Sequence, residues 1–354
     1  MGEEHAHRLG AELKFPLVTP DGSAAPESAV HALWDYLVER GWEAVRDAMT
    51  GNVIGAKKPG ERNDTMASCE TGYCKPEFSL AHVSDLHQLH RSIAELRAEI
   101  RFFSEQNDVL FLGYGIHPVT PPSKHLLMKK GRTSVWNKVF TSNQYVPEED
   151  GDDLHLFTIN TASHVHVSVP MDEAVRAVNV LNGFAGAQIA LTANSNIWRG
   201  AIDKRYKCVA EKFWDWWMPD GERVGIPGEP FQNLHHYVQT VAGFRPVFVK
   251  RAGKPIVLQK YATFEEYFHN KRAVGIDHLG REVSFAPEKG DIDLHSSCYW
   301  FNARISQYYT VENRANDQQP PDALLAIAAL TVGLISALPE AEEELASYEW
   351  RHLR

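Results

Sequence analysis

Polar side chains interrupt three apolar stretches of this chain, each time as a pair spaced two residues apart. The pairs are Glu12 and Lys14, His164 and His166, and Glu312 and Arg314. Side chains alternate along a strand, so each pair points to one face of its strand. An apolar core disfavours such a face because an unpaired buried charge is costly, whereas divalent metals and phosphate groups favour it. Three such strands in one sheet therefore predict an active-site face.

The hydrophobic spacing around these pairs predicts a succession of strands and helices. Helical periodicity is clearest between Ser84, a candidate cap, and Gln106. The other helices are expected over residues 27–49, 172–193, 263–269 and 320–349. Strands are expected over 11–18, 53–54, 78–80, 109–116, 157–169 and 307–314, with a hairpin formed by 247–250 and 256–258.

The order of these elements favours an α+β fold. No glycine-rich phosphate loop follows the first strand, which argues against a Rossmann or P-loop design. An antiparallel sheet with one polar face fits the pattern better. We expect a single catalytic domain over residues 1–354, in which residues 1–9 form a flexible N-terminal tail.

Composition narrows the function classes. The 354-residue chain is 44% hydrophobic and 23% charged, as is usual for a globular protein. A net charge of -10 and a pI near 5.9 argue against a nucleic-acid surface. Four cysteines are too few for a disulfide framework, and no signal peptide is apparent, so we expect a cytoplasmic protein. The longest apolar run, Leu324 to Leu338, is too short for a membrane span.

Six motifs occur in an order that resembles the glutamate–cysteine ligase family, in particular its compact bacterial carboxylate–amine ligase branch. They are GAELKFPLV, ETGYCKPEFSL, LGYGIHP, TASHVHVSVP, ALTANSNIWRG and TVENRANDQ, and they extend from Gly10 to Gln318. The resemblance implies a glutamine synthetase-like fold, an antiparallel sheet curved into a half-barrel with helices on its outer face.

The resemblance also implies an activity. Family enzymes form an amide from a carboxylate and an amine: ATP phosphorylates the carboxylate, and the amine then displaces phosphate from the acyl phosphate. Mg²⁺, with Mn²⁺ as an alternative, neutralises the phosphates during transfer. The expected partners are two small molecules, an acid and an amine, with no nucleic acid and no membrane. A homo-oligomer is compatible with the family.

Four residues match positions where the family holds metal: Glu12, Glu77, His166 and Glu312. Each also has a simpler interpretation. Glu12 could form an edge-strand salt bridge, and Glu77 could be a solvated loop acid. His166 could be a buried histidine bonded to a carbonyl group, and Glu312 could belong to a cross-strand pair with an arginine.

The resemblance assigns phosphate and nucleotide binding to a second group of residues. Arg314 matches the arginine that stabilises the transferred phosphoryl group, and a guanidinium suits phosphate oxygens by its geometry. Arg304 is expected to face the nucleotide or the substrate, and His164 shares a face with His166. Glu70 could orient the incoming amine.

Lys14 departs from the family pattern, which has a second glutamate at this position. An ammonium group carries only donors and cannot ligate magnesium. Lys14 could replace one metal ion, hold a phosphate or a substrate carboxylate, or mark a loss of catalysis. The usual arrangement of three metal ions is therefore in question.

The segment after the long helix also departs from the family. Asn194, Trp198 and Arg199 match a motif near the substrate pocket, but the arginine that normally follows is missing. Arg199 or Arg205 could substitute for it, so the acid substrate need not be glutamate. His117 is a further candidate substrate contact, or a residue that holds a strand end. The tryptophans at 214–217 are expected in the core or over a pocket.

Two other functional classes stay open. In the first, Lys14 has disabled the metal site and the chain is a ligand-binding pseudoenzyme. In the second, the histidines and carboxylates hold zinc or manganese for hydrolysis. The complete Glu312–Arg314 strand favours the ligase, because a simple hydrolase has no need of phosphate-binding arginines.

Overall fold

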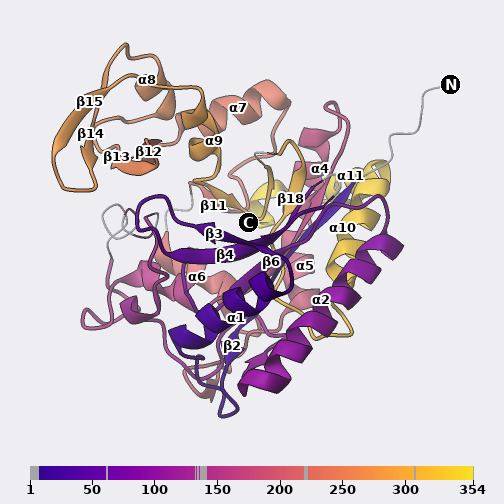
Figure 1. The fold of residues 1–354 in the computed structure, drawn as a ribbon. Helices are drawn as coiled ribbons and strands as arrows, with labels where there is room; N and C mark the ends of the chain where they lie inside the picture. Colours follow the sequence, from indigo (N-terminus) through magenta and orange to yellow (C-terminus); the bar gives the residue numbers. More distant parts are fainter. Residues whose placement is uncertain are drawn as a thin grey trace.

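The computed structural model describes residues 8–60, 63–131, 133, 135, 142–218, 222–306 and 308–353. Its centre is an eight-stranded antiparallel sheet that curls into a half-barrel (Figure 1). The strands, in spatial order, are β17 (Ala303–Ile305), β18 (Val311–Asn313), β8 (Ser163–Val167), β1 (Leu9–Lys14), β6 (Pro76–Ser79), β5 (Thr65–Cys69), β4 (Val53–Lys58) and β3 (Glu43–Arg46). An antiparallel sheet with helices was predicted, and this architecture confirms it; its kinship with glutamine synthetase stays a prediction.

Helices cover one face of the main sheet (Figure 1). They are α1 (Glu27–Glu39), α2 (Leu86–Asn107), α4 (Ala174–Gly183), α10 (Ala326–Ser336) and α11 (Leu338–Leu345). Alternation along β1 explains which face they cover. Leu9, Ala11 and Leu13 are buried in the same hydrophobic core as these helices, so Glu12 and Lys14 must point to the opposite face.

Shorter helices and strands lie between or after these elements in the chain. They are β2 (Leu17–Val18), β7 (Leu110–Phe111), η1 (Lys124–Leu126), η2 (Asp153–Thr158), α5 (Ala185–Thr192), β9 (Ile197–Trp198), β10 (Ala201–Ile202), α6 (Val209–Trp217), β11 (Val224–Gly225), α7 (Leu234–Gly243), α9 (Gly290–Ser296), β16 (Trp300–Phe301) and η3 (Trp350–His352). A second core cluster joins α6 to η2 through Phe213, Trp217, Leu154 and Phe157.

A separate four-stranded antiparallel sheet lies away from the main sheet (Figure 1). It consists of β12 (Phe248–Arg251), β13 (Lys254–Val257), β14 (Ala273–Asp277) and β15 (Glu282–Phe285), with α8 (Phe264–Phe268) beside it. The predicted hairpin is β12–β13, and its turn places Ala252 and Gly253 at positive φ, 48° and 76°. Within the described residues, none of the helices is long and apolar enough to cross a membrane.

Several predicted boundaries were wrong for local reasons. The helix expected over 27–49 ends at Glu39, because the chain reverses at Gly41, whose φ is 89°, and then enters β3. The cap of α2 is Asp85, whose side chain accepts a hydrogen bond from the Gln88 backbone, and Ser84 precedes it. The strand expected over 11–18 divides into β1 and β2, with Pro16 between them.

Long apolar segments were also divided more finely than their periodicity indicates. The strand expected over 109–116 is regular only in β7, and that over 157–169 begins as the 3-10 helix η2 before β8. The helix expected over 172–193 is divided into α4 and α5 at Phe184, and that over 320–349 into α10 and α11. The strand expected over 307–314 is β18, Val311–Asn313, with residue 307 outside the described part.

Candidate active site

The three polar pairs lie on adjacent strands of the main sheet. Glu12 on β1 is the register partner of His164 on β8, and His166 is the partner of Glu312 on β18. On the other side of β1, Lys14 is opposite Glu77 on β6. The sheet thus brings together side chains that are about 300 residues apart in sequence, on the face that the helices leave open.

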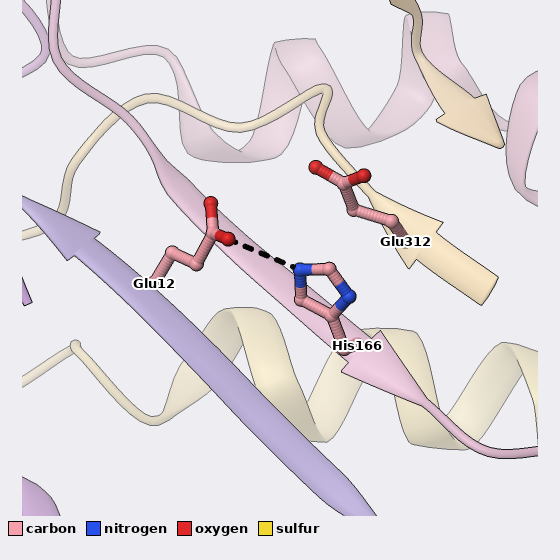
Figure 2. Close-up of side chains that lie close together, drawn as sticks. All are labelled: Glu12, His166 and Glu312. Atoms are coloured by element: carbon pink, nitrogen blue, oxygen red, sulfur yellow. Dashed lines mark ion pairs between the residues drawn. The ribbon is translucent and has the colours of Figure 1, made fainter. Parts of the chain in front are cut away.

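Glu12, His166 and Glu312 form a group that can hold a metal ion (Figure 2). One ligand atom from each lies within 4.8 Å of the others. The Nε2 atom of His166 is buried, lies 3.4 Å from Glu12 Oε1 and has no hydrogen-bond partner among the described residues. Its Nδ1 atom lies 3.0 Å from the Thr310 hydroxyl, which orients the ring as outer groups do around metal-binding histidines.

The charges of this group suit a cation. Burial opposes ionisation of Glu12, but the neighbouring rings of His164 and His166 and the charge of Lys14 hold its pKa well below the usual range. Burial also opposes ionisation of Glu312, but Arg304 and Arg314 lower its pKa. Two carboxylates and one open imidazole nitrogen are a donor set that fits Mn²⁺, and Mg²⁺ when water completes its shell.

Lys14 takes part in a different cluster. It is 4% exposed, and its ammonium nitrogen lies 3.2 Å from Glu70 Oε2, 3.2 Å from Glu77 Oε2 and 3.6 Å from Glu12 Oε2. Burial lowers the pKa of this ammonium, but the three carboxylates outweigh it and the pKa is raised. Glu77, expected among the metal ligands, is therefore paired with an ammonium ion and lies outside the group of Glu12, His166 and Glu312.

One ammonium ion cannot balance the charge of three carboxylates, and the pKa values of Glu70 and Glu77 shift in opposite directions. Burial opposes ionisation of Glu70, but Lys14 and Lys75 lower its pKa. Burial raises the pKa of Glu77 to about 7, against the attraction of Lys14. Glu77 is thus the member of this cluster that can take up a proton near neutral pH.

His164 lies between the two clusters as a neutral ring. Burial and the charges of Lys14 and Arg314 lower its pKa to about 3. Its Nδ1 atom lies 3.1 Å from Glu12 Oε2 and 3.2 Å from Lys14 Nζ. A carboxylate can only accept and an ammonium can only donate, so this nitrogen bonds one of them in either tautomer.

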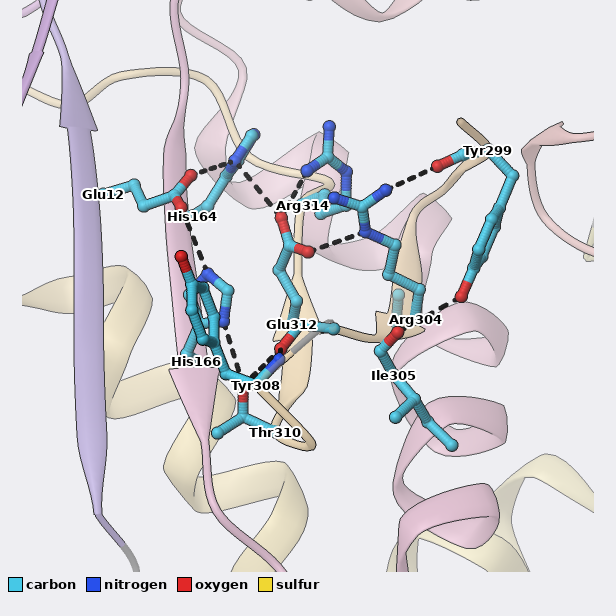
Figure 3. Close-up of polar contacts among 12 residues, drawn as sticks. Glu12, His164, His166, Tyr299, Arg304, Ile305, Tyr308, Thr310, Glu312 and Arg314 are labelled. Carbon is cyan, nitrogen blue, oxygen red and sulfur yellow. Dashed lines mark hydrogen bonds and ion pairs between the residues drawn. The ribbon is translucent and has the colours of Figure 1, made fainter. Parts of the chain in front are cut away.

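Two arginines hold the far side of Glu312 (Figure 3). Arg304 Nε donates to Glu312 Oε2 at 2.7 Å, and Arg314 Nη1 donates to Glu312 Oε1. Arg304 also donates to the carbonyl oxygen of Tyr299 at 2.6 Å. The two guanidinium groups are therefore fixed beside the candidate metal ligands, where they can neutralise phosphate oxygens.

A cleft opens beside these clusters. Its polar lining includes four of the expected residues, Lys14, Glu70, His164 and Arg314. Its apolar lining comes from η2, α6 and β16: Leu154, Phe157, Ala210, Trp214, Trp217, Trp300 and Phe301. The tryptophans at 214 and 217 therefore cover a pocket, one of the two places expected for them.

The sequence analysis missed four ionisable residues of the cleft: Lys75, Lys130, Glu211 and Asp317. Burial raises the pKa of Glu211 to about 8 and that of Asp317 to about 6, and it lowers that of Lys75 to about 8. Lys75 Nζ donates to the carbonyl and side-chain oxygens of Asn160, at 2.9 and 2.8 Å. A sequence signal existed for Glu211 alone, which precedes Trp214 by one helical turn and so shares its face.

The expected substrate residues are placed elsewhere. Asn194 holds the backbone through the carbonyl groups of Gly113 and Gln318, and His117 is buried against the Cys74 carbonyl. Arg199 stacks on Trp198 and donates to the Tyr145 carbonyl, while Arg205 is 74% exposed beside Asp203. These four residues, Asn194, His117, Arg199 and Arg205, are absent from the described lining of the cleft.

Comparison with known proteins identifies the family. The model of the glutamate-cysteine ligase family 2 (GCS2) matches residues 8–352. The chain belongs to this family. The resemblance found in the sequence motifs is thereby confirmed, over almost the whole chain.

The sequence identity to individual members of the family is below 30%. The chain is 29% identical over 282 residues to a protein of Rubrobacter xylanophilus named "Putative glutamate--cysteine ligase 2-3", a match that covers 79% of this chain and 61% of that protein. It is 23% identical over 231 residues to a "Putative glutamate--cysteine ligase 2" of Gloeobacter violaceus, covering 64% and 50%. The matches thus span between half and three-fifths of these relatives.

One solved structure is a weak match to the fold. The glutamate–cysteine ligase of Francisella tularensis, solved with AMP, is 11% identical, with a TM-score of 0.49 over 97% of this chain and 71% of that one. At this level the likeness carries no argument about the site.

Proposed function

We propose that this protein is an ATP- and Mg²⁺-dependent ligase that forms an amide between a carboxylate and an amine. The carboxylate attacks the terminal phosphorus of ATP and ADP leaves. The amine then attacks the acyl phosphate and expels phosphate. Membership of the glutamate-cysteine ligase family supports this reaction class. Divalent metal, held by Glu12, His166 and Glu312, would neutralise the phosphate charge.

The observation that carries the proposal is the position of Glu312 between two kinds of group. On one side it completes the candidate metal ligands, and on the other it holds Arg304 and Arg314. Arg314 also lines the cleft, so a phosphoryl group there would meet a guanidinium beside the candidate metal ligands. Phosphoryl transfer depends on such fixed positive charge more than on any covalent step.

The cleft favours a substrate pair other than glutamate and cysteine. The segment after Trp198 places Arg199 and Arg205 away from the cleft, so neither reads a substrate carboxylate there. Lys75, Lys130 and Arg314 are the described cleft cations outside the Lys14 cluster, and they can take this role. The aromatic wall from Trp214 to Trp300 gives the second substrate a largely apolar environment.

Magnesium-dependent ATP turnover against a panel of acids and amines, offered singly and in pairs, tests the proposal. We expect ADP and phosphate release that needs one acid and one amine, and that is lost in Glu312→Ala. The matched control is Glu105→Ala on the exposed face of α2, which should retain full activity. AMP as the product would contradict the acyl phosphate, and Glu312→Ala with wild-type turnover would exclude the proposed site.

Lys14 favours a second candidate, a ligand-binding pseudoenzyme. Its ammonium occupies the centre of an acidic cluster that could otherwise hold a metal ion. Absence of ATP turnover with any amine, together with absence of ATP binding, would favour this function. A metal-dependent hydrolase is the third class, and protein purified without added metal yet containing zinc would support it.

A further inference from the structure

One wall of the cleft combines aromatic rings with a carboxylate. Glu211, Trp214 and Trp217 come from α6, and Trp300 comes from β16. The ring centroids of Trp217 and Trp300 are 5.1 Å apart, and those of Trp214 and Trp300 are 5.9 Å apart. Phe157 extends this group, 4.4 Å from Trp214. The wall is therefore a continuous aromatic surface with one acid on it.

The carboxylate of Glu211 has no hydrogen bond or ion pair among the described residues. The nearest described positive charge that acts on it is Arg314, and that guanidinium already donates to Glu312. The other charges near Glu211 are acidic: Asp317 in the cleft and Asp215 on α6. Burial and, to a lesser extent, these two acids raise the pKa of Glu211 to about 8. No cation among the described residues pairs with this carboxylate, so a bound ligand with a positive charge would be its partner.

Each lysine of the cleft already has a polar partner and lies outside α6 and β16. Lys14 is held by its three carboxylates, Lys75 by Asn160, and Lys130 by the carbonyl oxygen of Cys69 at 2.6 Å. The lysines thus come from β1 and from the segments before β6 and after η1, and Arg314 follows β18, whereas the tryptophans and Glu211 come from α6 and β16. This division of charge suits a ligand that is positive at the aromatic wall.

We propose that this wall binds an organic ammonium ion, with the ammonium group paired to Glu211 and its apolar body against Trp214, Trp217 and Trp300. Aromatic faces and a carboxylate are the combination that attracts such cations. The inference rests on the proposed function in one respect, since the bound cation would be the amine substrate. Asp317 and Glu211 would repel a carboxylate beside the nitrogen, so the amine is a simple alkyl or arylalkyl amine.

Titration calorimetry on the full chain, without ATP or metal and at a mildly alkaline pH above the Glu211 pKa of about 8, tests the inference with three probes of similar size. Benzylamine carries the ammonium group, benzyl alcohol is its neutral counterpart, and benzoate reverses the charge. We expect benzylamine to bind about tenfold or more tightly than benzyl alcohol, and benzoate more weakly than either. Equal affinities for the amine and the alcohol, or a preference for benzoate, would overturn the inference.

Glu211→Gln keeps the shape of the side chain but cannot ionise, so it offers no carboxylate to the ammonium group. We expect it to weaken benzylamine binding by about tenfold and to leave benzyl alcohol binding unchanged, which shows that the wall is still folded. Asp215→Asn is the matched control, since this acid is exposed on the same helix and should bind benzylamine like the wild type. Benzylamine binding that is unchanged in Glu211→Gln would also overturn the inference.

This test is independent of ligation because ATP is absent. If benzylamine binds as expected while no ATP turnover is found with any substrate pair, the proposed function fails and the ammonium site stands. If turnover is found only with amino acids as the amine, and benzylamine does not bind, the ligase stands and the ammonium site fails.

Discussion

The ammonium nitrogen of Lys14 lies 3.2 Å from a carboxylate oxygen of Glu77, its register partner on the adjacent strand β6. The same nitrogen is within 3.6 Å of two further glutamates, Glu12 and Glu70. Three carboxylates around one point are an arrangement suited to a divalent ion. In this protein a side chain supplies the positive charge there, and the candidate metal ligands are gathered at Glu312 instead.

Loss of this ammonium should destabilise the fold. We expect Lys14→Met to lower the free energy of unfolding by about 3 kcal/mol or more, because the neighbouring buried acids lose their balancing charge. Urea unfolding measures the change. The control is Lys57→Met, which breaks solvent-exposed pairs with Glu43 and Asp64 and should lower the free energy of unfolding far less. Equal effects of the two substitutions would mean that the cluster contributes nothing beyond a surface ion pair.

Reversing the charge should create a metal site. In Lys14→Glu, four glutamates surround the position of the ammonium, and we expect Mn²⁺ to bind there in addition to any ion held by Glu12, His166 and Glu312. Saturating Mn²⁺ should therefore raise the melting temperature of the variant more than that of the wild type. Titration calorimetry should also count one more bound ion. Identical ion counts would show that Lys14 does not occupy a cation position.

The hydroxyl group of Thr310 should tune the candidate metal site through His166. It lies 3.0 Å from Nδ1 and leaves Nε2 open towards Glu12. We expect Thr310→Val to weaken Mn²⁺ binding by about tenfold, because the ring loses the partner that fixes its orientation. Thr310→Ser retains the hydroxyl and should bind Mn²⁺ like the wild type. A valine variant with undiminished affinity would argue that His166 is not a ligand.

Glu211 should make stability depend on pH. Its folded-state pKa of about 8 lies above the ordinary value of 4.5, so the folded protein keeps a proton that the unfolded chain releases. This contribution to stability is complete below the ordinary pKa and is lost as the pH rises through about 8. Glu211→Gln cannot titrate, so we expect it to gain stability relative to the wild type, by at least about 1 kcal/mol, between acidic and mildly alkaline pH. Urea unfolding at both pH values checks this, and a constant difference would contradict it.

Local patterns predicted the chemistry of the sheet face well. Glu12 and Lys14 share a face because side chains alternate along the backbone of a strand. The apolar residues that alternate with them showed which face of the strand is buried. The family motifs supplied His166, Glu312 and Arg314, and the structure brings these side chains together. The partners of Lys14 were not predicted, because register between distant strands cannot be read from either strand alone.

Substrate contacts were predicted less well. Asn194 and His117 belong to matched motifs, yet their hydrogen bonds hold backbone carbonyl groups. Glu211 belongs to no matched motif, yet it lines the cleft. A motif records which side chains are present, whereas the direction of each depends on the turns that separate short elements such as β9 and β10.

By itself, the sequence determined the family, the antiparallel sheet with a polar face, and the helices that cover its apolar face. These follow from periodicity and motif order, which act over a few residues at a time. Only the tertiary structure decided that Lys14 lies among three acids, that Glu77 pairs with it, and that Glu211 lies against an aromatic wall with no ion pair among the described residues. The physical reason is that each depends on strand register and long-range packing, which bring distant residues within a few ångströms of one another.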